Sequence, residues 1–328
     1  KNEKSPGNDG ISKEFYEVFW EHIRIPLMQS INNSFYINEL SNSQKQAVIK
    51  LIEKKDKDKR LIKNWRPISL LNVDAKLISK ALANKLKNVI PSLVSANQTA
   101  FVKDRYISEG GRLISDILEI SSKLGLKGYL MTVDIEKAFD SVNHIFLICV
   151  LERFGFGINF LKWIKILLKN QESCVINGVK TTKYFQLHRG TRQGDPISPY
   201  LFILVLEMVF HLIKTNTNIE GLNIFDNNFL YTAYADDTTF FTKDEKSVKE
   251  IINVFDKFSF FSGLKLNKEK CEIAGIGVKK GVNLALCGIQ CVNLEEDCIK
   301  ILGVYYSYSK VRENEMNFVT HVKKYKMF

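Results

Sequence analysis

The amino-acid sequence predicts an α+β fold, with helices packed on one face of a mostly antiparallel sheet. Two observations predict it. Stretches with apolar side chains at helical spacing alternate with short runs rich in β-branched and aromatic residues, and turn residues join several of these runs as hairpins. The 328 residues suffice for one large domain or two ordinary ones, and no internal repeat or Ser/Gly-rich linker divides them.

The first part of the chain alternates helical and extended stretches. Turn residues fill 5–10, and apolar side chains then recur at helical spacing. A β-branched run at 47–53 and the stretch 65–70 enclose a highly charged segment, so we expect a hairpin with a solvated tip. A helix with one basic face fits 74–89.

From residue 128 the period of the pattern changes. A buried strand fits 129–133, and Asp140 is a good N-cap for the helix that follows it. The dipeptide Asn177-Gly178 indicates a hairpin. Ser198 as N-cap and Pro199 at the first helical position predict a buried helix that runs to about Lys214.

The last part of the chain is expected to contain a tight hairpin. Strands at 229–234 and 238–241 flank Ala235-Asp236-Asp237. A helix and two further stretches of strand follow, at about 247–261, 264–273 and 299–306.

The net charge narrows the class of partner. Lysine and arginine outnumber aspartate and glutamate by 47 to 36, which gives a formal charge of +11. This excess favours a polyanionic partner, of which nucleic acid is the commonest. An anionic membrane surface is the alternative. The longest apolar run, 200–210, is broken by Glu207, so no transmembrane segment is expected.

The six cysteines indicate a reducing intracellular compartment. None belongs to a CxxC pair or has a histidine at metal-finger spacing, so a zinc site is not expected. The chain begins at Lys1, without a signal peptide or an initiating Met, and we expect it to be cut from a longer protein.

Three aspartates stand where carboxylates are costly. Asp134 ends an apolar strand, and Asp236 and Asp237 interrupt an aromatic hairpin. Burying an unpaired carboxylate costs several kcal/mol unless a cation compensates it, and Mg²⁺ with oxygen ligands does so well. Such carboxylates can hold two metals about 4 Å apart, the arrangement for in-line displacement at phosphorus.

These carboxylates also have ordinary interpretations. Adjacent Asp residues in a turn are commonly turn formers, and Glu136 fits a solvated surface. The combination favours the metal site, because a strand-end Asp, a hairpin with two Asp and an intervening Gly/Pro-rich loop occur in one basic chain.

The same residues resemble motifs of reverse transcriptases of the LINE (non-LTR retrotransposon) type. Tyr234-Ala235-Asp236-Asp237 matches their YxDD box, 134–140 their first carboxylate motif, and 189–199 (RGTRQGDPISP) the loop and helix between them. The tetrad alone is weakly specific, whereas the eleven-residue loop motif is highly specific. The resemblance covers essentially the whole chain through further matching segments, at 5–10, 64–70, 98–105, 262–267 and 301–304.

This resemblance implies the right-hand polymerase fold. Fingers with an N-terminal extension would occupy 1–125, an antiparallel palm sheet with packed helices 126–310, and the start of a truncated thumb 311–328. The endonuclease and the C-terminal cysteine-rich segment of full LINE proteins are expected to be absent.

It also implies the catalytic residues. Asp134, Asp236 and Asp237 would be the catalytic carboxylates. Asp134, Asp236 and the carbonyl of Ile135 would hold two Mg²⁺ ions, for which Mn²⁺ is a substitute. Phe139 would exclude the 2′-hydroxyl of a ribonucleotide, and the alternative is an ordinary core phenylalanine.

Further positions match contacts to the nucleotide. Gln193 and Gly194 resemble residues that contact the incoming nucleotide and the templating base pair. Arg105 matches a phosphate-binding arginine, although Asp104 replaces a glycine common at that position. The remaining candidates are Lys76 and Arg66 for the triphosphate, and Arg189 and Arg192 for phosphate or surface ion pairs. Lys270, with Lys268 as alternative, would protonate pyrophosphate, and the ordinary interpretation of either is a solvated lysine.

The residues Leu302, Gly303 and Val304 resemble the strand pair that supports the primer's 3′ end, the primer grip. By this resemblance the chain is an RNA-directed DNA polymerase, a nucleotidyltransferase of retrotransposition that acts in the cytoplasm and the nucleus. Its partners would be an RNA template, a DNA primer or target and dNTPs, with no membrane; the oligomeric state stays open.

Three alternatives remain at this point. A group II intron maturase or retron-type enzyme has the same palm, although the residues at 65–70 and 198–201 favour the LINE type. A catalytically incomplete or domesticated fragment would bind RNA without polymerising. A plain basic nucleic-acid-binding module would not need the spacing of the carboxylates.

Overall fold

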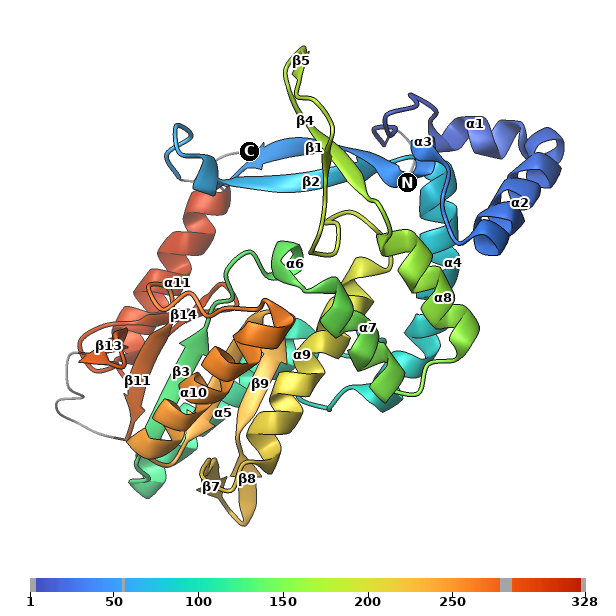
Figure 1. The fold of residues 1–328 in the computed structure, drawn as a ribbon. Coiled ribbons are helices and arrows are strands. Elements are labelled where there is room, and N and C mark those ends of the chain that lie inside the picture. Colours follow the sequence, from blue (N-terminus) through green and yellow to red (C-terminus); the bar gives the residue numbers. More distant parts are fainter. Residues whose placement is uncertain (1–3, 55–56, 278–284, 326–328) are drawn as a thin grey trace. The chain divides into compact units, whose positions relative to one another are not determined.

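The computed structural model describes residues 4–54, 57–277 and 285–325 (Figure 1). The chain divides into two compact units. The first unit contains residues 1–93 and 139–205, and the second contains 94–138 and 206–328. The units are therefore interleaved along the chain, unlike the linear division at residues 125 and 310 that the resemblance implies. That division is functional and stays a prediction.

The first unit begins with helices around a β-hairpin. Its elements up to residue 93 are α1 (Lys13–Val18), α2 (Trp20–Ile37), α3 (Asn42–Lys45), β1 (Gln46–Glu53), the 3-10 turn η1 (Ile62–Asn64), β2 (Trp65–Leu71) and α4 (Val73–Leu93). The expected hairpin is confirmed, because β1 and β2 pair antiparallel from Ala47↔Leu71 to Glu53↔Trp65.

The same unit contains a five-stranded sheet built on this hairpin. Its other strands are β4 (Glu172–Asn177), β5 (Lys180–Thr181) and β6 (Phe185–Gln186). Strand β1 pairs parallel with β4, and β4 turns back into β5. The turn is the predicted one, since Asn177 pairs with Lys180 and Gly178 has a φ of 61°, which glycine adopts without strain.

The helices that precede β4 in the chain correct the expectation that Asp140 is an N-cap. They are α6 (Ala138–Ser141), α7 (His144–Arg153) and α8 (Ile158–Leu168). Asp140 lies inside α6 and is not an N-cap. Asn143 caps α7 instead, because its Oδ1 accepts from the N–H groups of Ile145 and Phe146 at 2.8 and 3.1 Å.

Helix α9 (Ser198–Thr215) continues from the first unit into the second. It begins at Ser198 itself, which was expected to stand just before it. By length and composition α9 could cross a membrane, but 56% of this helix is buried inside the structure. The core helix of a soluble protein has the same composition, and α9 matches the buried helix expected here.

The second unit is built on a six-stranded, mostly antiparallel sheet. Its strand order is β12 (Ala285–Leu286), β13 (Ile289–Val292), β11 (Glu272–Ile276), β3 (Gly128–Val133), β10 (Asp237–Thr242) and β9 (Tyr231–Tyr234). Only the β11–β13 pair is parallel among these neighbours. The predicted strands 129–133, 229–234 and 238–241 are confirmed as β3, β9 and β10.

Helices cover both faces of this sheet, whereas helices on one face were expected. The neighbours Phe240 and Phe241 are both fully buried, and successive side chains of a strand point to opposite faces. Phe241 packs in a core cluster with Ile114 of α5 (Ile107–Leu124). Phe240 contacts Phe255 of α10 (Glu245–Ser262), with ring centroids 6.1 Å apart. A strand without a solvated face needs a helix on each side.

Two small hairpins and a helix complete the second unit. They are β7 (Leu222–Ile224) with β8 (Asn227–Phe229), β14 (Ile299–Ile301) with β15 (Val304–Tyr306), and α11 (Lys310–Tyr325). The strand expected at 264–273 is mostly absent: only an isolated bridge, Ile135↔Leu266, forms there before β11 begins at Glu272.

The sandwiched sheet gives a test by substitution. We expect Phe240→Ala to lower the free energy of unfolding by about 3–5 kcal/mol, because it leaves a cavity among packed aromatic rings. Phe260→Ala is the matched control, since Phe260 of α10 is 85% exposed. Urea unfolding followed by circular dichroism measures both. Equal midpoints for the two variants would contradict helices on both faces.

Candidate active site

The turn between β9 and β10 carries two of the three aspartates. Tyr234 pairs with Asp237, so Ala235 and Asp236 form a two-residue connection. Ala235 has a φ of 57°, in the left-handed region that such turns require at their first position and that usually selects glycine. Asp236 therefore sits at the tip, and Asp237 starts β10.

Asp134 reaches the same end of the sheet from the neighbouring strand. Val133, the last residue of β3, pairs with Thr238 of β10. One step further in this antiparallel register, Asp134 and Asp237 stand opposite each other. The structure thus brings together the three aspartates that the sequence singled out.

The segment after α10 holds Asp134 in place. The Asp134 carbonyl accepts from the N–H of Asn267 at 2.8 Å, and the N–H of Glu136 donates to the Lys265 carbonyl at 2.8 Å. Because these flanking residues make the bonds of the Ile135↔Leu266 bridge, the carbonyl of Ile135 itself points away from this segment. That direction is compatible with the metal-binding role expected for Ile135.

The carboxylates repel one another. Burial raises the pKa of Asp236, and the charge of Asp134 raises it further. Burial, followed by the charges of Asp236 and Asp134, raises the pKa of Asp237 to about 6. One cation offsets part of this charge: Lys270 Nζ lies 3.0 Å from Asp134 Oδ2. The alternative Lys268 pairs with Asp256 instead, at 3.3 Å.

The carboxylates at this end of the sheet suit Mg²⁺ that is bound partly by water and substrate, rather than an ion enclosed by protein side chains alone. In the part of the chain that the structure describes, no group of three or more His, Cys, Asp or Glu side chains is arranged to hold an ion by itself. Mg²⁺ is commonly bound by one or two carboxylates, with water and substrate phosphates completing its shell. Two mutually repelling carboxylates at one end of a sheet suit that mode.

Arg105 lies in the second unit but binds the protein's own backbone. Its Nη1 donates to the carbonyls of Ser95 and Gln98, at 2.6 and 2.7 Å. The preceding Asp104 has a φ of 61°, so it adopts the conformation that explains why glycine is common there. The contact between Arg105 and a triphosphate stays a prediction.

The expected primer grip is the tip of the β14–β15 hairpin. Leu302 and Gly303 form its turn with φ values of 52° and 86°, and Ile301 pairs with Val304. The Leu302 side chain packs toward α5, because a Cβ at Gly110 would lie 3.6 Å from its Cδ1. The hairpin tip is thereby seated on the helix that covers the sheet.

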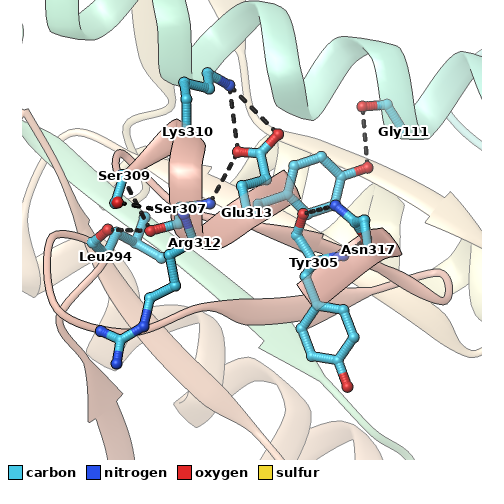
Figure 2. A network of polar contacts seen from close by, with 10 residues as sticks. Gly111, Leu294, Tyr305, Ser307, Ser309, Lys310, Arg312, Glu313 and Asn317 are labelled. Atoms are coloured by element: carbon cyan, nitrogen blue, oxygen red, sulfur yellow. Dashed lines mark hydrogen bonds and ion pairs between the residues drawn. The ribbon is translucent and has the colours of Figure 1, made fainter. Parts of the chain in front are cut away.

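A polar network fixes this hairpin to α11 (Figure 2). The Asn317 amide pairs with the backbone of Tyr305: its Nδ2 donates to the carbonyl and its Oδ1 accepts from the N–H, both at 2.9 Å. Glu313 accepts from the Ser307 N–H at 3.2 Å and pairs with Lys310 at 3.2 Å. Helix α11 and the hairpin are therefore one assembly.

The first unit contains the other predicted residues, each described there by itself. Phe139 stacks on Phe202 with centroids 4.5 Å apart, which both of its interpretations allow. The Gln193 carbonyl accepts from the Ser69 N–H at 2.7 Å, and a Cβ at Gly194 would lie 2.6 Å from the Ser69 carbonyl oxygen. Only glycine lets the loop approach β2 this closely.

The basic candidates of the first unit differ in environment. Arg66 is exposed on β2. Lys76 is partly buried on α4, and burial lowers its pKa. Arg192 corrects an expectation, since it is neither a surface ion pair nor exposed to a ligand: it is 6% exposed, and its Nη2 donates to the carbonyls of Lys45 and Glu172.

Gln98 is the residue that sequence reasoning missed. It is fully buried, and its side chain bonds to the backbone of Ala235 in the β9–β10 turn. The sequence did place Gln98 in the segment 98–105, which resembles the family, but that resemblance did not indicate which residue Gln98 contacts.

Comparison with known proteins identifies similar sequences. The family model described as reverse transcriptase (RNA-dependent DNA polymerase) matches residues 52–306. The transposon TX1 uncharacterized 149 kDa protein of Xenopus laevis is 33% identical over 93% of this chain and 23% of that protein. The retrovirus-related Pol polyprotein from type-2 retrotransposable element R2DM of Drosophila melanogaster is 26% identical over 83% of this chain and 25% of that protein. This chain thus spans about a quarter of these relatives' length.

The fold is also similar to a solved structure. The structure of apo telomerase from Candida Tropicalis, truncated from its C-terminal domain, matches with a TM-score of 0.53 at 13% identity. The match covers 84% of this chain and 57% of that chain. At this identity the likeness concerns the fold alone, which is a mixed α+β, polymerase-like fold.

The repulsion among the carboxylates has a measurable cost. Because the pKa of Asp237 is raised to about 6, its contribution favours folding at low pH and is lost as the pH rises through 6. In EDTA at pH 7.5 we expect Asp237→Asn to be more stable than the wild type by about 1 kcal/mol, because Asp237 keeps enough contact with solvent for its charge to be screened in part. The gain should shrink below pH 6.

Thermal unfolding between pH 4 and pH 8 checks this expectation. Asp226→Asn, in the exposed β7–β8 turn, is the matched control and should leave stability unchanged. A loss of stability in Asp237→Asn at pH 7.5 would contradict mutual repulsion.

Proposed function

Because this chain belongs to the reverse transcriptase (RNA-dependent DNA polymerase) family, we propose that it extends a DNA 3′-hydroxyl along an RNA template by two-metal nucleotidyl transfer, in retrotransposition. One observation carries the proposal: β3 and the β9–β10 turn bring Asp134, Asp236 and Asp237 to one end of a sheet. The similarity to non-LTR retrotransposon proteins supports it.

Asp134, Asp236 and the carbonyl of Ile135 are the proposed ligands for two Mg²⁺ ions, with Mn²⁺ as a substitute. When bound, the ions would lower the pKa of the attacking hydroxyl and neutralise charge on the leaving pyrophosphate. The protein's part is to keep the carboxylates close together despite their repulsion. Asp237 adds negative charge beside the two ligands.

Lys270 is the proposed proton donor to pyrophosphate. Its ammonium lies 3.0 Å from Asp134 Oδ2, and its side chain is 60% exposed, so it can leave the carboxylate when other cations arrive. Lys268 is less suited, because its partner Asp256 is an acid outside the three-carboxylate group. A general acid at this point would protonate a departing phosphate oxygen.

The remaining assignments extend the proposal over the chain. The sheet of the second unit corresponds to the palm, the β1–β2 hairpin to the fingers, and α11 to the start of the thumb. Gln193, Gly194, Arg105, Lys76 and Arg66 are proposed nucleotide contacts, and the β14–β15 turn is the proposed primer grip. RNA template, DNA primer or target and dNTPs are the proposed partners, in the cytoplasm and nucleus, consistent with the charge of +11.

The direct test is primer extension on an RNA template with Mg²⁺. Asp236→Asn should lower the rate at least about 10³-fold, because metal charge stabilisation contributes several kcal/mol. Asp226→Asn should extend like the wild type. If the folded wild type binds primer–template but never extends it, the alternative replaces this proposal: the chain is then a catalytically incomplete or domesticated fragment that binds RNA without polymerising.

The role of Phe139 has its own test. Phe139→Ala or Phe139→Val should admit ribonucleotides and reduce the preference for dNTPs about tenfold or more, because the ring no longer fills the space of a 2′-hydroxyl. Competition between dCTP and CTP in single-nucleotide extension measures the preference. If Phe139 is only a partner of Phe202, stability will fall and the preference will not change.

A further inference from the structure

The segment before Arg105 forms an isolated bridge to the edge of the sheet in the second unit. Strand β9 is the last strand of that sheet. The Ala233 N–H donates to the Asn97 carbonyl at 2.9 Å, and the Thr99 N–H donates to the Ala233 carbonyl at 2.9 Å. Gln98 is therefore the residue that lies beside β9, in a parallel bridge with Ala233.

From this position the Gln98 side chain reaches the turn that carries Asp236. Its Oε1 accepts from the N–H of Ala235 at 2.9 Å and from the N–H of Ala100 at 3.0 Å. Its Nε2 donates to the Ala235 carbonyl at 3.4 Å. One primary amide thus satisfies both backbone polar groups of Ala235.

Ala235 needs such a partner for two reasons. Its φ of 57° is costly for any residue with a Cβ, by about 1–2 kcal/mol. It is also 5% exposed, so water cannot readily replace a lost hydrogen bond. An unpaired buried backbone group costs about 1–3 kcal/mol, so the turn would relax toward another conformation without Gln98.

The backbone of Gln98 is itself held from behind. Arg105 donates to the Gln98 and Ser95 carbonyls, and the Thr99 hydroxyl donates to the Ala233 carbonyl at 3.2 Å. Gln98 is 0% exposed, so its amide has no solvent to compete for it. These bonds hold the backbone of Gln98 beside β9 within the second unit.

We propose that Gln98 is a positioning residue: it fixes the Ala235 peptide and, through it, the direction of the Asp236 carboxylate. The inference rests on the proposed function of Asp236 as a metal ligand. The chemistry requires a neutral amide, because a donor and an acceptor are used on one planar group. Leucine lacks both. Glutamate lacks the donor, and it adds a negative charge near the three aspartates, which already repel one another.

The experiment compares Gln98→Leu with Gln44→Leu. Gln44 is the matched control, because it is 2% exposed and also uses both amide atoms, toward Asp74 and Ser41 in the first unit. We expect Gln98→Leu to lower kcat for primer extension about 10- to 100-fold with KM for dNTP within about twofold of wild type, since a misplacement near 1 Å has effects of this size. Gln44→Leu should lose stability alone.

A second variant and a second readout keep the test decisive. Ala235→Gly in the Gln98→Leu background should restore part of kcat, because glycine adopts a φ of 57° without strain, even when the Gln98 amide is missing. Electron paramagnetic resonance of Mn²⁺ with primer–template should give weaker binding for Gln98→Leu than for Gln44→Leu. If Gln98→Leu does not fold, Gln98→Asn, which keeps a shorter amide, replaces it.

The outcomes separate the two proposals. A wild type that extends, with Gln98→Leu equal to it in kcat and Mn²⁺ affinity, overturns the role of Gln98 and leaves the polymerase proposal intact. A wild type that never extends overturns the polymerase proposal, and the Mn²⁺ comparison still decides whether Gln98 positions the carboxylates.

Discussion

The repulsion among Asp134, Asp236 and Asp237 is the constraint on which the second unit depends. Three carboxylates at one end of a sheet repel one another, so they stay close together only where the backbone holds them there. The register Val133↔Thr238 and the two-residue turn after Tyr234 impose that proximity. Backbone bonds to Asn267 and Lys265 hold the segment around Asp134, and the Gln98 side chain holds the turn.

The rest of the second unit stabilises this arrangement through packing. Both Phe240 and Phe241 are buried, so the strand that begins with Asp237 is fixed from two sides by helices. The repulsion therefore works against a rigid sheet. A site of this kind gives up some stability without its cation and gains it when a cation binds.

The sequence was sufficient to predict much of this. Periodicity located β3, β9, β10 and α4, and dipeptides such as Asn177-Gly178 located turns, because these signals are local. The family resemblance at Tyr234-Ala235-Asp236-Asp237 and at 189–199 is confirmed by the comparisons. The three aspartates were singled out because charge in an apolar run is visible without a structure.

Long-range pairings were not predictable from one sequence. The contact of Gln98 with Ala235 spans 137 residues, and nothing local distinguishes a buried glutamine from an exposed one. Arg192 was misread for the same reason, since its carbonyl partners at Lys45 and Glu172 are distant in the chain. The prediction of Asp140 as an N-cap was wrong, because Asn143, three residues later, can accept the same hydrogen bonds and caps α7.

The proposed mechanism requires Asp134 and Asp236 to share one site that holds two divalent cations. Anomalous diffraction from crystals of the chain with primer–template, a nonhydrolysable dNTP and Mn²⁺ tests it most directly. We expect Mn²⁺ peaks within coordination distance of both carboxylates, with the Ile135 carbonyl as a further ligand. Mn²⁺ bound elsewhere, with these carboxylates uncoordinated, would contradict the account.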